Sequence, residues 1–474
     1  MGTLLSFRIF TLLFCTAAIV ASGQVAVDNA PSASDQAPSI GTVIKQKLTD
    51  SLEVLALHYP KSVKRYYEHR RFEPAWIKPQ GVTGQAWDAM LLFDCVLQYG
   101  LLHADYHPQE LLYEQMDKFA KARPSGSNLE KAHFDIMLTD ALLAFMNHLH
   151  YGKLNPRYPA DAIDKGYMGG FDAGTALVMA LQQDDFMRAV TGVQPSSAAY
   201  THLQEYMKLV TSQYAGDCYE VPEGDIRKIA LNMERLRWVE RSDDTYIHIN
   251  IPSGTLVFHR PDSSYLFRVV FGKPETPTAM IQSHIRYFYT APEWKVPHQL
   301  FIKHLLPIAL EDSNFLSENR FVIYDRKGNY VRPNEHNLRQ INRNPESYYA
   351  RQSTGTDNSL GHIVFRFANP LGVYLQDTPD QQVFHQERKA VSNGNMLVER
   401  ADRLASLLLE TEGKKRNVQR LQRSLSGYTP MTFTLRKSVP ISITYLTCEI
   451  KDGLLVFYDD VYGLDPVLEL AYFR

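Results

Sequence analysis

A short polar segment, Ser392-Asn393-Gly394-Asn395, carries the side chains best placed to do chemistry, and Gln376 precedes it by a spacer of fifteen residues. Carboxamide side chains donate and accept hydrogen bonds, but they do not ionise near neutral pH and are poor acyl acceptors. Gly394 lacks a side chain, so backbone N–H groups beside it can converge on one point. The segment therefore offers groups that can hydrogen-bond a carboxylate or an amide, without a group that would react with it. A polar turn that binds nothing is the open alternative.

The competing hypothesis is a reaction that uses a nucleophile located outside this segment. The thiolate is the strongest candidate, and the chain has four cysteines, none of them in a CxxC pair. Cys95 falls on the apolar face of an expected helix and Cys448 falls in an alternating strand, which favours packing roles for both. Cys218 lies in an expected loop and is therefore the cysteine with the best prospect of exposure.

A hydroxyl nucleophile or a metal site would need histidine in the right place. Ser392 could pair with His385, seven residues upstream, or with His362, but the pattern shows no carboxylate to orient either ring. His148 and His150 are two residues apart, a spacing that points them to different faces of a helix. The sequence therefore predicts no metal ion and no cofactor.

The composition limits the classes of protein that are possible. The chain has 474 residues, 45% of them hydrophobic, and its 50 basic and 52 acidic residues leave a formal net charge of −2. These values are typical of a folded chain with more than one domain rather than of a disordered one. The near-zero charge removes the general electrostatic argument for a nucleic-acid partner.

The N-terminus predicts export. Residues 1–23 have the form of a signal peptide, with the apolar run Ile9–Val20 followed by the small residues Ala21-Ser22-Gly23. The run is shorter than a membrane span needs, so no transmembrane segment is expected after cleavage. A retained anchor, or a lipid on Cys15, is the alternative. Residues 24–40 are expected to form a flexible leader.

Two halves with different hydrophobic periods must position the polar segment. Residues 41–238 repeat apolar side chains every three or four positions, which predicts an all-helical scaffold. The clearest stripe is Phe134, Leu138, Leu142, Phe145 and Leu149. Residues 244–474 alternate with a period of two and are rich in turn residues, which predicts an antiparallel β domain. Residues 298–360 form a more polar, lid-like insertion, and residues 399–423 return to a helical pattern. The expected fold class is α+β.

Short motifs run in a fixed order from about residue 45 to the C-terminus. They include Tyr66-Tyr67, Pro74-Ala75-Trp76, Gly152-Lys153-Leu154-Asn155-Pro156, Asn232-Met233-Glu234-Arg235-Leu236-Arg237-Trp238, Trp294-Lys295-Val296-Pro297, Asn369-Pro370 and Asp459-Asp460-Val461-Tyr462-Gly463. In their order and spacing they resemble the large periplasmic L,D-transpeptidases, which cross-link peptidoglycan. The resemblance implies a helical scaffold joined to an L,D-transpeptidase-type domain, and a location in the periplasm.

The chemistry of that family requires a cysteine nucleophile and a histidine base, which pass a stem-peptide acyl group through a thioester. Here Gln376 stands where the family has its first histidine, Asn393 stands at the base position and Asn395 at the nucleophile position. Leu397 replaces the usual arginine. The positions that match the family are Ser392 and Gly394. The normal mechanism is therefore expected to be impossible at this site.

The resemblance also implies which residues line the substrate cleft and its lid: Trp294, Arg351, Asn358 and Tyr374. Many members insert a small peptidoglycan-binding module before the Asn-Met-Glu-Arg motif. Here the helix around Tyr200–Val210 is followed after about fifteen residues by Gly224-Asp225-Ile226, which is too short for a module with its own core.

These patterns together predict an exported L,D-transpeptidase homologue in peptidoglycan metabolism that has lost catalysis and binds a stem peptide or a cell-wall protein partner. Two alternatives remain. One is an acyltransferase or peptidase that uses a displaced nucleophile. The other is a structural partner of an active paralogue.

Overall fold

The computed structural model describes residues 38–50, 55–121, 126–166, 170–211, 222–239, 244–413 and 415–473. The expected signal segment, most of the expected leader and Cys218 lie outside these residues. Within the described ranges, no helix combines the length and the apolar character that crossing a bilayer would require.

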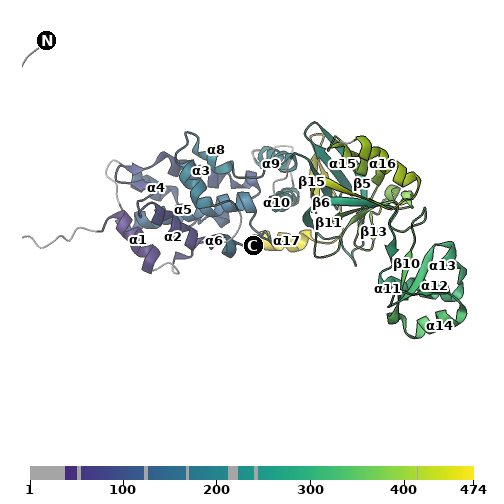
Figure 1. The fold of residues 1–474 in the computed structure, drawn as a ribbon. Helices are drawn as coiled ribbons and strands as arrows, with labels where there is room; N and C mark the ends of the chain where they lie inside the picture. Colours follow the sequence, from purple (N-terminus) through teal and green to yellow (C-terminus); the bar gives the residue numbers. More distant parts are fainter. Residues whose placement is uncertain are drawn as a thin grey trace, which may run out of the picture.

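The first half of the chain is helical and forms one end of the molecule (Figure 1). Its helices are α1 Ile40–Asp50, α2 Pro60–His69, α3 Gly84–Asp94, α4 Tyr113–Ala120, α5 Asn128–Tyr151, α6 Ala160–Asp164, α7 Ala173–Ala180, α8 Phe186–Thr191, α9 Ala198–Thr211 and α10 Glu223–Arg237, with a small hairpin of β1 Ile77–Lys78 and β2 Gly81–Val82. Eleven residues, 212–222, separate α9 from α10.

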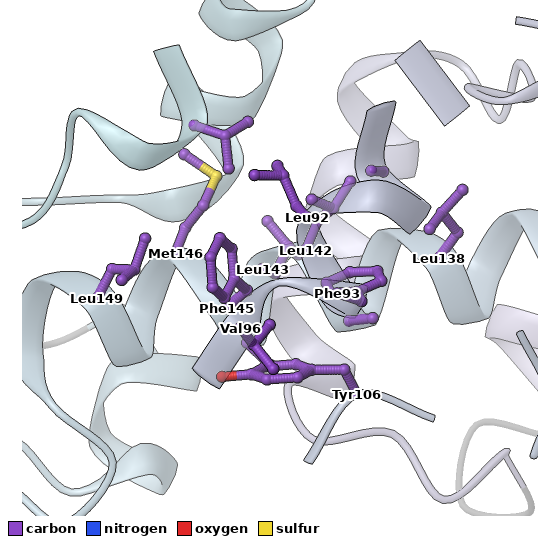
Figure 2. Packing of buried hydrophobic residues seen from close by; sticks show 14 of the residues in the cluster. Leu92, Phe93, Val96, Tyr106, Leu138, Leu142, Leu143, Phe145, Met146 and Leu149 are labelled. Carbon is purple, nitrogen blue, oxygen red and sulfur yellow. The ribbon is translucent and has the colours of Figure 1, made fainter. Parts of the chain in front are cut away.

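Helix α5 is the centre of this half. It begins at a capping box, in which Ser127 Oγ accepts from Glu130 N (3.2 Å) and the Glu130 carboxylate accepts from Ser127 N (2.7 Å). The five apolar residues of the expected stripe all lie in α5 and are fully buried, which confirms the helical periodicity. Phe93 and Tyr106 pack against Phe145 with ring centroids 6.1 and 5.6 Å away (Figure 2). The other helices therefore surround α5 and bury it on all sides.

A buried carboxylate fastens the β1 segment to α5. Asp135 has no exposed surface, and its two carboxylate oxygens accept from the backbone N–H groups of Ala75, Trp76 and Ile77, each at 2.8 Å. The Tyr67 hydroxyl donates to the same carboxylate at 2.6 Å. One side chain thus satisfies four buried donors, and burial of those donors without it would be costly.

A closed ring of strands forms the second half. Its strands are β3 Tyr246–Asn250, β4 Thr255–Arg260, β5 Ser263–Gly272, β6 Ile281–Thr290, β11 Ile363–Phe367, β12 Leu375–Gln376, β13 Ala390–Ser392, β14 Met396–Val398 and β15 Met431–Thr444. The order β5-β14-β12-β11-β6-β15-β3-β4 closes because β4 pairs with β5, and β13 adds to β5 outside the ring.

The mixed α+β class is as expected, but the pairing is not purely antiparallel. Three strand pairs are parallel: β12 with β14, β13 with β5, and β15 with β3. The physical reason for the β12–β14 pair is the chain between them, residues 377–395, which crosses back before it re-enters the sheet. Helices α15 Ala401–Glu410 and α16 Lys415–Ser426 cover one side, and Leu404, Leu407 and Leu408 of α15 are fully buried in the core of this half (Figure 1).

The insertion between β6 and β11 folds as a separate small unit, which projects from the ring in Figure 1. It contains β7 Trp294–Lys295, α11 His298–Leu300, α12 Leu306–Glu311, α13 Asn314–Glu318, β8 Phe321–Asp325, β9 Tyr330–Val331, α14 Glu335–Arg343 and β10 Tyr348–Gln352. Its own core includes Phe301, Ile323 and Ile341. The unit begins and ends earlier than the expected range 298–360, because β7 pairs with β10.

The C-terminal segment returns to the helical half. It contains the hairpin β16 Cys448–Lys451 and β17 Leu454–Phe457, followed by α17 Asp465–Tyr472. Leu446, Cys448 and Tyr472 belong to the same buried cluster as the scaffold helices. The β domain was expected to include residues 244–474. Leu446, Cys448 and Tyr472 lie in that range but pack with the scaffold helices.

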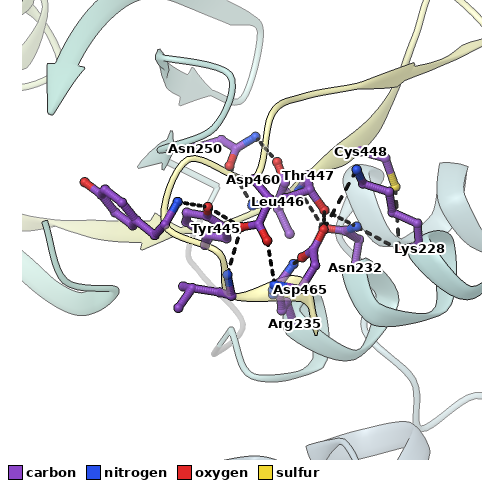
Figure 3. Close-up of polar contacts among 12 residues, drawn as sticks. Lys228, Asn232, Arg235, Asn250, Tyr445, Leu446, Thr447, Cys448, Asp460 and Asp465 are labelled. Atoms are coloured by element: carbon purple, nitrogen blue, oxygen red, sulfur yellow. Dashed lines mark hydrogen bonds and ion pairs between the residues drawn. The ribbon is translucent and has the colours of Figure 1, made fainter. Parts of the chain in front are cut away.

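Polar contacts between α10 and the C-terminal segment join the two halves (Figure 3). Asn232 Oδ1 accepts from Thr447 N at 2.8 Å, and its Nδ2 donates to Thr447 Oγ1 at 3.0 Å. Arg235 forms an ion pair with Asp465 at 2.6 Å, and Thr447 Oγ1 donates to the other oxygen of that carboxylate at 2.8 Å. The Arg235 side chain is 3% exposed, so this ion pair is buried.

The helical half should lose stability in acid because of His148. This histidine is buried in α5 beside the Tyr106 hydroxyl (3.0 Å), and burial lowers its pKa to about 3. Below the unfolded pKa of about 6.5 the unfolded chain binds a proton that the folded chain does not, so the free energy of unfolding falls as the pH falls. We expect His148 to contribute about 1.4 kcal/mol per pH unit between about pH 6 and 4.

Urea unfolding of the His148→Gln variant at several pH values measures this contribution. The variant should lose part of the acid slope of the wild type, whereas His103→Gln, at an exposed position of the same half, should keep it. Equal slopes for all three proteins would show that His148 is not the group responsible.

Candidate active site on the closed sheet

Two short parallel strands bring the predicted site residues together. Strand β12 pairs with β14 so that Leu375 lies opposite Met396 and Gln376 opposite Leu397. Leu375 and Met396 are fully buried in the core inside the ring. Because side chains alternate along a strand, Gln376 and Leu397 lie on the outer face.

The Ser392–Asn395 segment forms a tight turn between β13 and β14. Gly394 has φ +96°, a conformation that side chains disfavour, which explains glycine at this position. Its carbonyl accepts from Thr278 Oγ1 at 2.9 Å. The Ser392 hydroxyl donates to the carbonyl of Asn395 across the turn. Side chains thus hold the turn in place from both sides.

The two asparagines differ in their surroundings. Asn393, at the tip of the turn, is exposed, whereas Asn395 is half-buried. Asn395 Oδ1 accepts from the backbone N–H of Tyr374 at 3.3 Å, which ties the turn to the start of β12. In the described part of the chain, no protein group accepts a hydrogen bond from Asn395 Nδ2. This amide can therefore donate to a ligand.

Gln376 and Leu397 contact neighbouring residues of the protein and not an open site. Gln376 is buried, and its Nε2 donates to the carbonyls of Ser359 (3.0 Å) and Asp377 (3.2 Å). Leu397 packs against an apolar cluster that includes Val270 and Phe384. Neither residue presents a group that can move a proton.

The four residues expected to line the cleft fall into two groups. Trp294 and Arg351 belong to the insertion, where Trp294 packs beside Phe321 with a centroid distance of 6.3 Å. Arg351 is exposed, lies over the ring of Tyr349 (5.5 Å) and is 3.7 Å from Glu293. Tyr374 lies just before β12 of the closed sheet and is half-buried.

Asn358 has a mainly structural environment. It is 2% exposed, and its Nδ2 donates to the carbonyls of Pro292 and Ser353, both at 3.0 Å. Its Oδ1 accepts from Leu360 N at 2.8 Å. Both ends of its amide therefore tie together the two chain segments at the base of the insertion.

One arginine near the turn escaped the sequence analysis. Arg366, on β11, lies with its Cζ 4.2 Å from the ring centroid of Tyr374, and its Nη2 donates to the Tyr289 hydroxyl at 3.1 Å. The feature that could have pointed to Arg366 is its charge, since it is the partly exposed residue of an otherwise buried strand, Ile363–Phe367. That signal is weak without knowledge of the neighbouring strands.

The two cysteines that the structure describes, Cys95 and Cys448, do not supply a nucleophile near this turn. Cys448 is fully buried in the core shared with the scaffold, and burial raises the pKa of its thiol to about 12. Cys95 is exposed at the end of α3 in the helical half, so the expectation that it lies on an apolar helix face was wrong. Helix α3 ends at Asp94, so Cys95 follows the helix and does not belong to its apolar face.

The histidines considered as partners of Ser392 are engaged elsewhere. His385 Nδ1 lies 3.0 Å from Arg268 Nη1, which donates to it. His362 Nδ1 lies 3.7 Å from the Asp377 carboxylate. Among the described residues, the serine hydroxyl has its hydrogen bond with the Asn395 carbonyl and none with a histidine.

A second group of titratable side chains lies in the helical half. The nearest ligand atoms of His58, His107 and Asp140 are within 4.8 Å of one another. The Asp140 carboxylate already accepts from His107 Nε2 (2.7 Å) and from the backbone N–H groups of His58 (2.8 Å) and Tyr59 (2.9 Å). These bonds hold the start of α2, and they account for the cluster without a ligand.

Comparison with known proteins adds two findings. A family model described as "Scaffold domain" matches residues 61–207. A Haemophilus influenzae protein named "Putative L,D-transpeptidase" is 32% identical over 250 residues, which is 52% of this chain and 49% of that protein. The chain thus spans about half the length of the curated relative that it matches.

Proposed function

We propose, from the premise that the chain belongs to the L,D-transpeptidase family with a scaffold domain, that it is an exported cell-wall protein that binds peptidoglycan stem peptide without acyl transfer. The proposed binding site is the outer face of the closed sheet around the Ser392–Asn395 turn. The periplasm is the proposed location, with residues 1–23 as the export signal.

The chemistry of the turn is the observation that carries this proposal. Asn395 stands at the nucleophile position and Asn393 at the base position, and a carboxamide neither ionises near neutral pH nor forms a useful thioester-like intermediate. Loss of either group alone typically costs orders of magnitude in rate. The described cysteines, Cys95 and Cys448, lie in the helical half and in its shared core.

The same turn keeps the groups that recognise a peptide. Asn393 is exposed, and Asn395 Nδ2 is available to donate. A side-chain amide can both donate to a peptide carbonyl and accept from a peptide N–H group. Trp294 and Arg351 of the insertion are proposed to contact the same peptide when the insertion lies over the turn, which gives the insertion the role of a lid.

Mass spectrometry of the purified protein after incubation with disaccharide tetrapeptide tests the absence of catalysis. We expect no cross-linked or trimmed product and no increase in protein mass, because no thiol or base occupies the turn. The double variant Asn393→His/Asn395→Cys serves as the matched control. A mass increase on that variant alone would show that the peptide reaches the turn.

Product from the wild type would contradict the proposal. In that case Ser392→Ala and Cys218→Ser, made separately, would identify the displaced nucleophile as the residue whose loss abolishes turnover. Absence of both turnover and binding would instead favour the second candidate function, in which the chain is a structural partner of an active paralogue.

A further inference from the structure

The outer face of the closed sheet carries a cation beside the turn. We infer that Arg366, held between Tyr289 and Tyr374, is the binding site for a carboxylate group of the peptide ligand. This inference rests on the proposed function, since it identifies the chemical group that the same site recognises.

Strand register places these side chains on the outer face. Phe365 of β11 pairs with Leu375 of β12, and both are fully buried inside the ring. Arg366 follows Phe365 on β11, and Tyr374 directly precedes Leu375, so both point outward. Strand β6 continues the face, because Val364 pairs with Tyr289.

Two tyrosines fix the orientation of the guanidinium group. Its Cζ lies 4.2 Å from the ring centroid of Tyr374 and 5.9 Å from that of Tyr289. Nη2 donates to the Tyr289 hydroxyl at 3.1 Å. Stacking on the tyrosine faces removes much of the rotational freedom of the long side chain before any ligand arrives, so less entropy is lost on binding. An arginine has five N–H donors, so several remain for an anion.

The charge of Arg366 has no anionic partner among the residues that the structure describes. Across the described ranges no carboxylate lies within ion-pair distance of its guanidinium group. The buried Arg235, by contrast, pairs with Asp465 at 2.6 Å. A half-buried charge without a counter-ion is costly, and a carboxylate from a ligand would offset that cost. A planar carboxylate also matches the guanidinium fork, which can donate two parallel hydrogen bonds.

The guanidinium group of Arg366 lies next to the proposed peptide site. The same Tyr374 that stacks on Arg366 donates its backbone N–H to Asn395 Oδ1 at 3.3 Å. Burial raises the pKa of the Tyr374 phenol, so its hydroxyl stays protonated at neutral pH and can donate as well. A peptide whose carboxylate sits on Arg366 would therefore extend over the amides of the Gly394 turn.

Calorimetry with two ligands tests this inference. One ligand is the stem tetrapeptide, and the other is the same peptide with its carboxylates converted to carboxamides. We expect the wild type to bind the free acid about ten-fold or more tightly than the amide, as a charge-assisted hydrogen bond implies. Arg366→Gln should reduce affinity for the acid to that for the amide, and Arg366→Lys should retain part of the difference because it keeps the charge.

Arg403 provides the matched control. It lies on α15, stacks over Tyr265 at 5.8 Å and pairs with Glu410 at 3.4 Å, so Arg403→Gln also removes an arginine stacked on a tyrosine. Its affinity for the acid should equal that of the wild type. Thermal unfolding of all variants separates a folding defect from a binding defect.

Equal affinity of the wild type for acid and amide, or an unchanged affinity in Arg366→Gln, would overturn the carboxylate site and leave the proposed peptide binding intact. Failure of the wild type to bind either ligand, with the protein folded, would overturn the proposed function and this inference with it.

Discussion

Replacement of Asp135 by alanine is expected to lower the free energy of unfolding of the helical half by about 3 kcal/mol or more. The carboxylate accepts from the backbone N–H groups of Ala75, Trp76 and Ile77 and from the Tyr67 hydroxyl, all of them buried. Each buried donor left unsatisfied costs about 1–3 kcal/mol. The Tyr67 hydroxyl keeps the backbone carbonyl of residue 135 and Thr139 Oγ1 as partners, so the three backbone donors give about 3 kcal/mol at the low end. This is a large share of the stability of an ordinary domain.

Urea unfolding followed by tryptophan fluorescence measures the loss, because Trp76 lies beside Asp135 and donates its Nε1 hydrogen to Thr139. Asp172→Ala is the matched control, since this exposed aspartate caps α7 through a single bond to Thr175 N and should cost about 1 kcal/mol. A loss in Asp135→Ala no greater than in the control would show that the segment is held by something else.

Asp465→Ala is expected to weaken the junction between the halves by about 3–5 kcal/mol. The Arg235 side chain that pairs with Asp465 is 3% exposed, so removal of the carboxylate leaves a buried cation without a partner. The bond from Thr447 Oγ1 is lost as well (Figure 3). We therefore expect both a lower unfolding midpoint and faster proteolytic cleavage near the junction.

Glu469 on the same helix supplies the control for this prediction. Its carboxylate lies 3.6 Å from Arg227 and is 41% exposed, and such surface pairs contribute at most about 1 kcal/mol. Glu469→Ala should therefore resemble the wild type in both measurements. Similar losses in the two variants would mean that the Arg235–Asp465 pair does not hold the junction.

The local parts of this fold could be predicted from the sequence because they follow local periods. The stripe from Phe134 to Leu149 repeats at helical spacing, and it lies in α5. The alternation of Ile247, Ile249 and Ile251 marks a strand, and Ile247 and Ile249 lie in β3. Strand direction was not predictable in the same way, because it depends on how the connecting chain crosses the sheet.

The features that could not be predicted depend on contacts between segments that are far apart in the sequence. Nothing in the pattern around Cys448 or Tyr472 signals that these residues return to the scaffold core. Arg366 was not predicted for the same reason, since its partner Tyr289 lies on β6 and its partner Tyr374 lies just before β12, neither of them near Arg366 in the sequence. The residues of the turn were identified through the resemblance to the L,D-transpeptidase motif, which places Ser392 to Asn395 at the positions of its catalytic segment.

Binding of stem peptide without acyl transfer is tested most directly by a single titration. Disaccharide tetrapeptide is titrated into the wild-type protein in a calorimeter, and the recovered sample is then analysed by mass spectrometry. We expect a saturable heat of binding, with both the ligand and the protein recovered at unchanged mass. Absence of saturable heat, or recovery of a cross-linked, trimmed or protein-bound product, would contradict the proposed function.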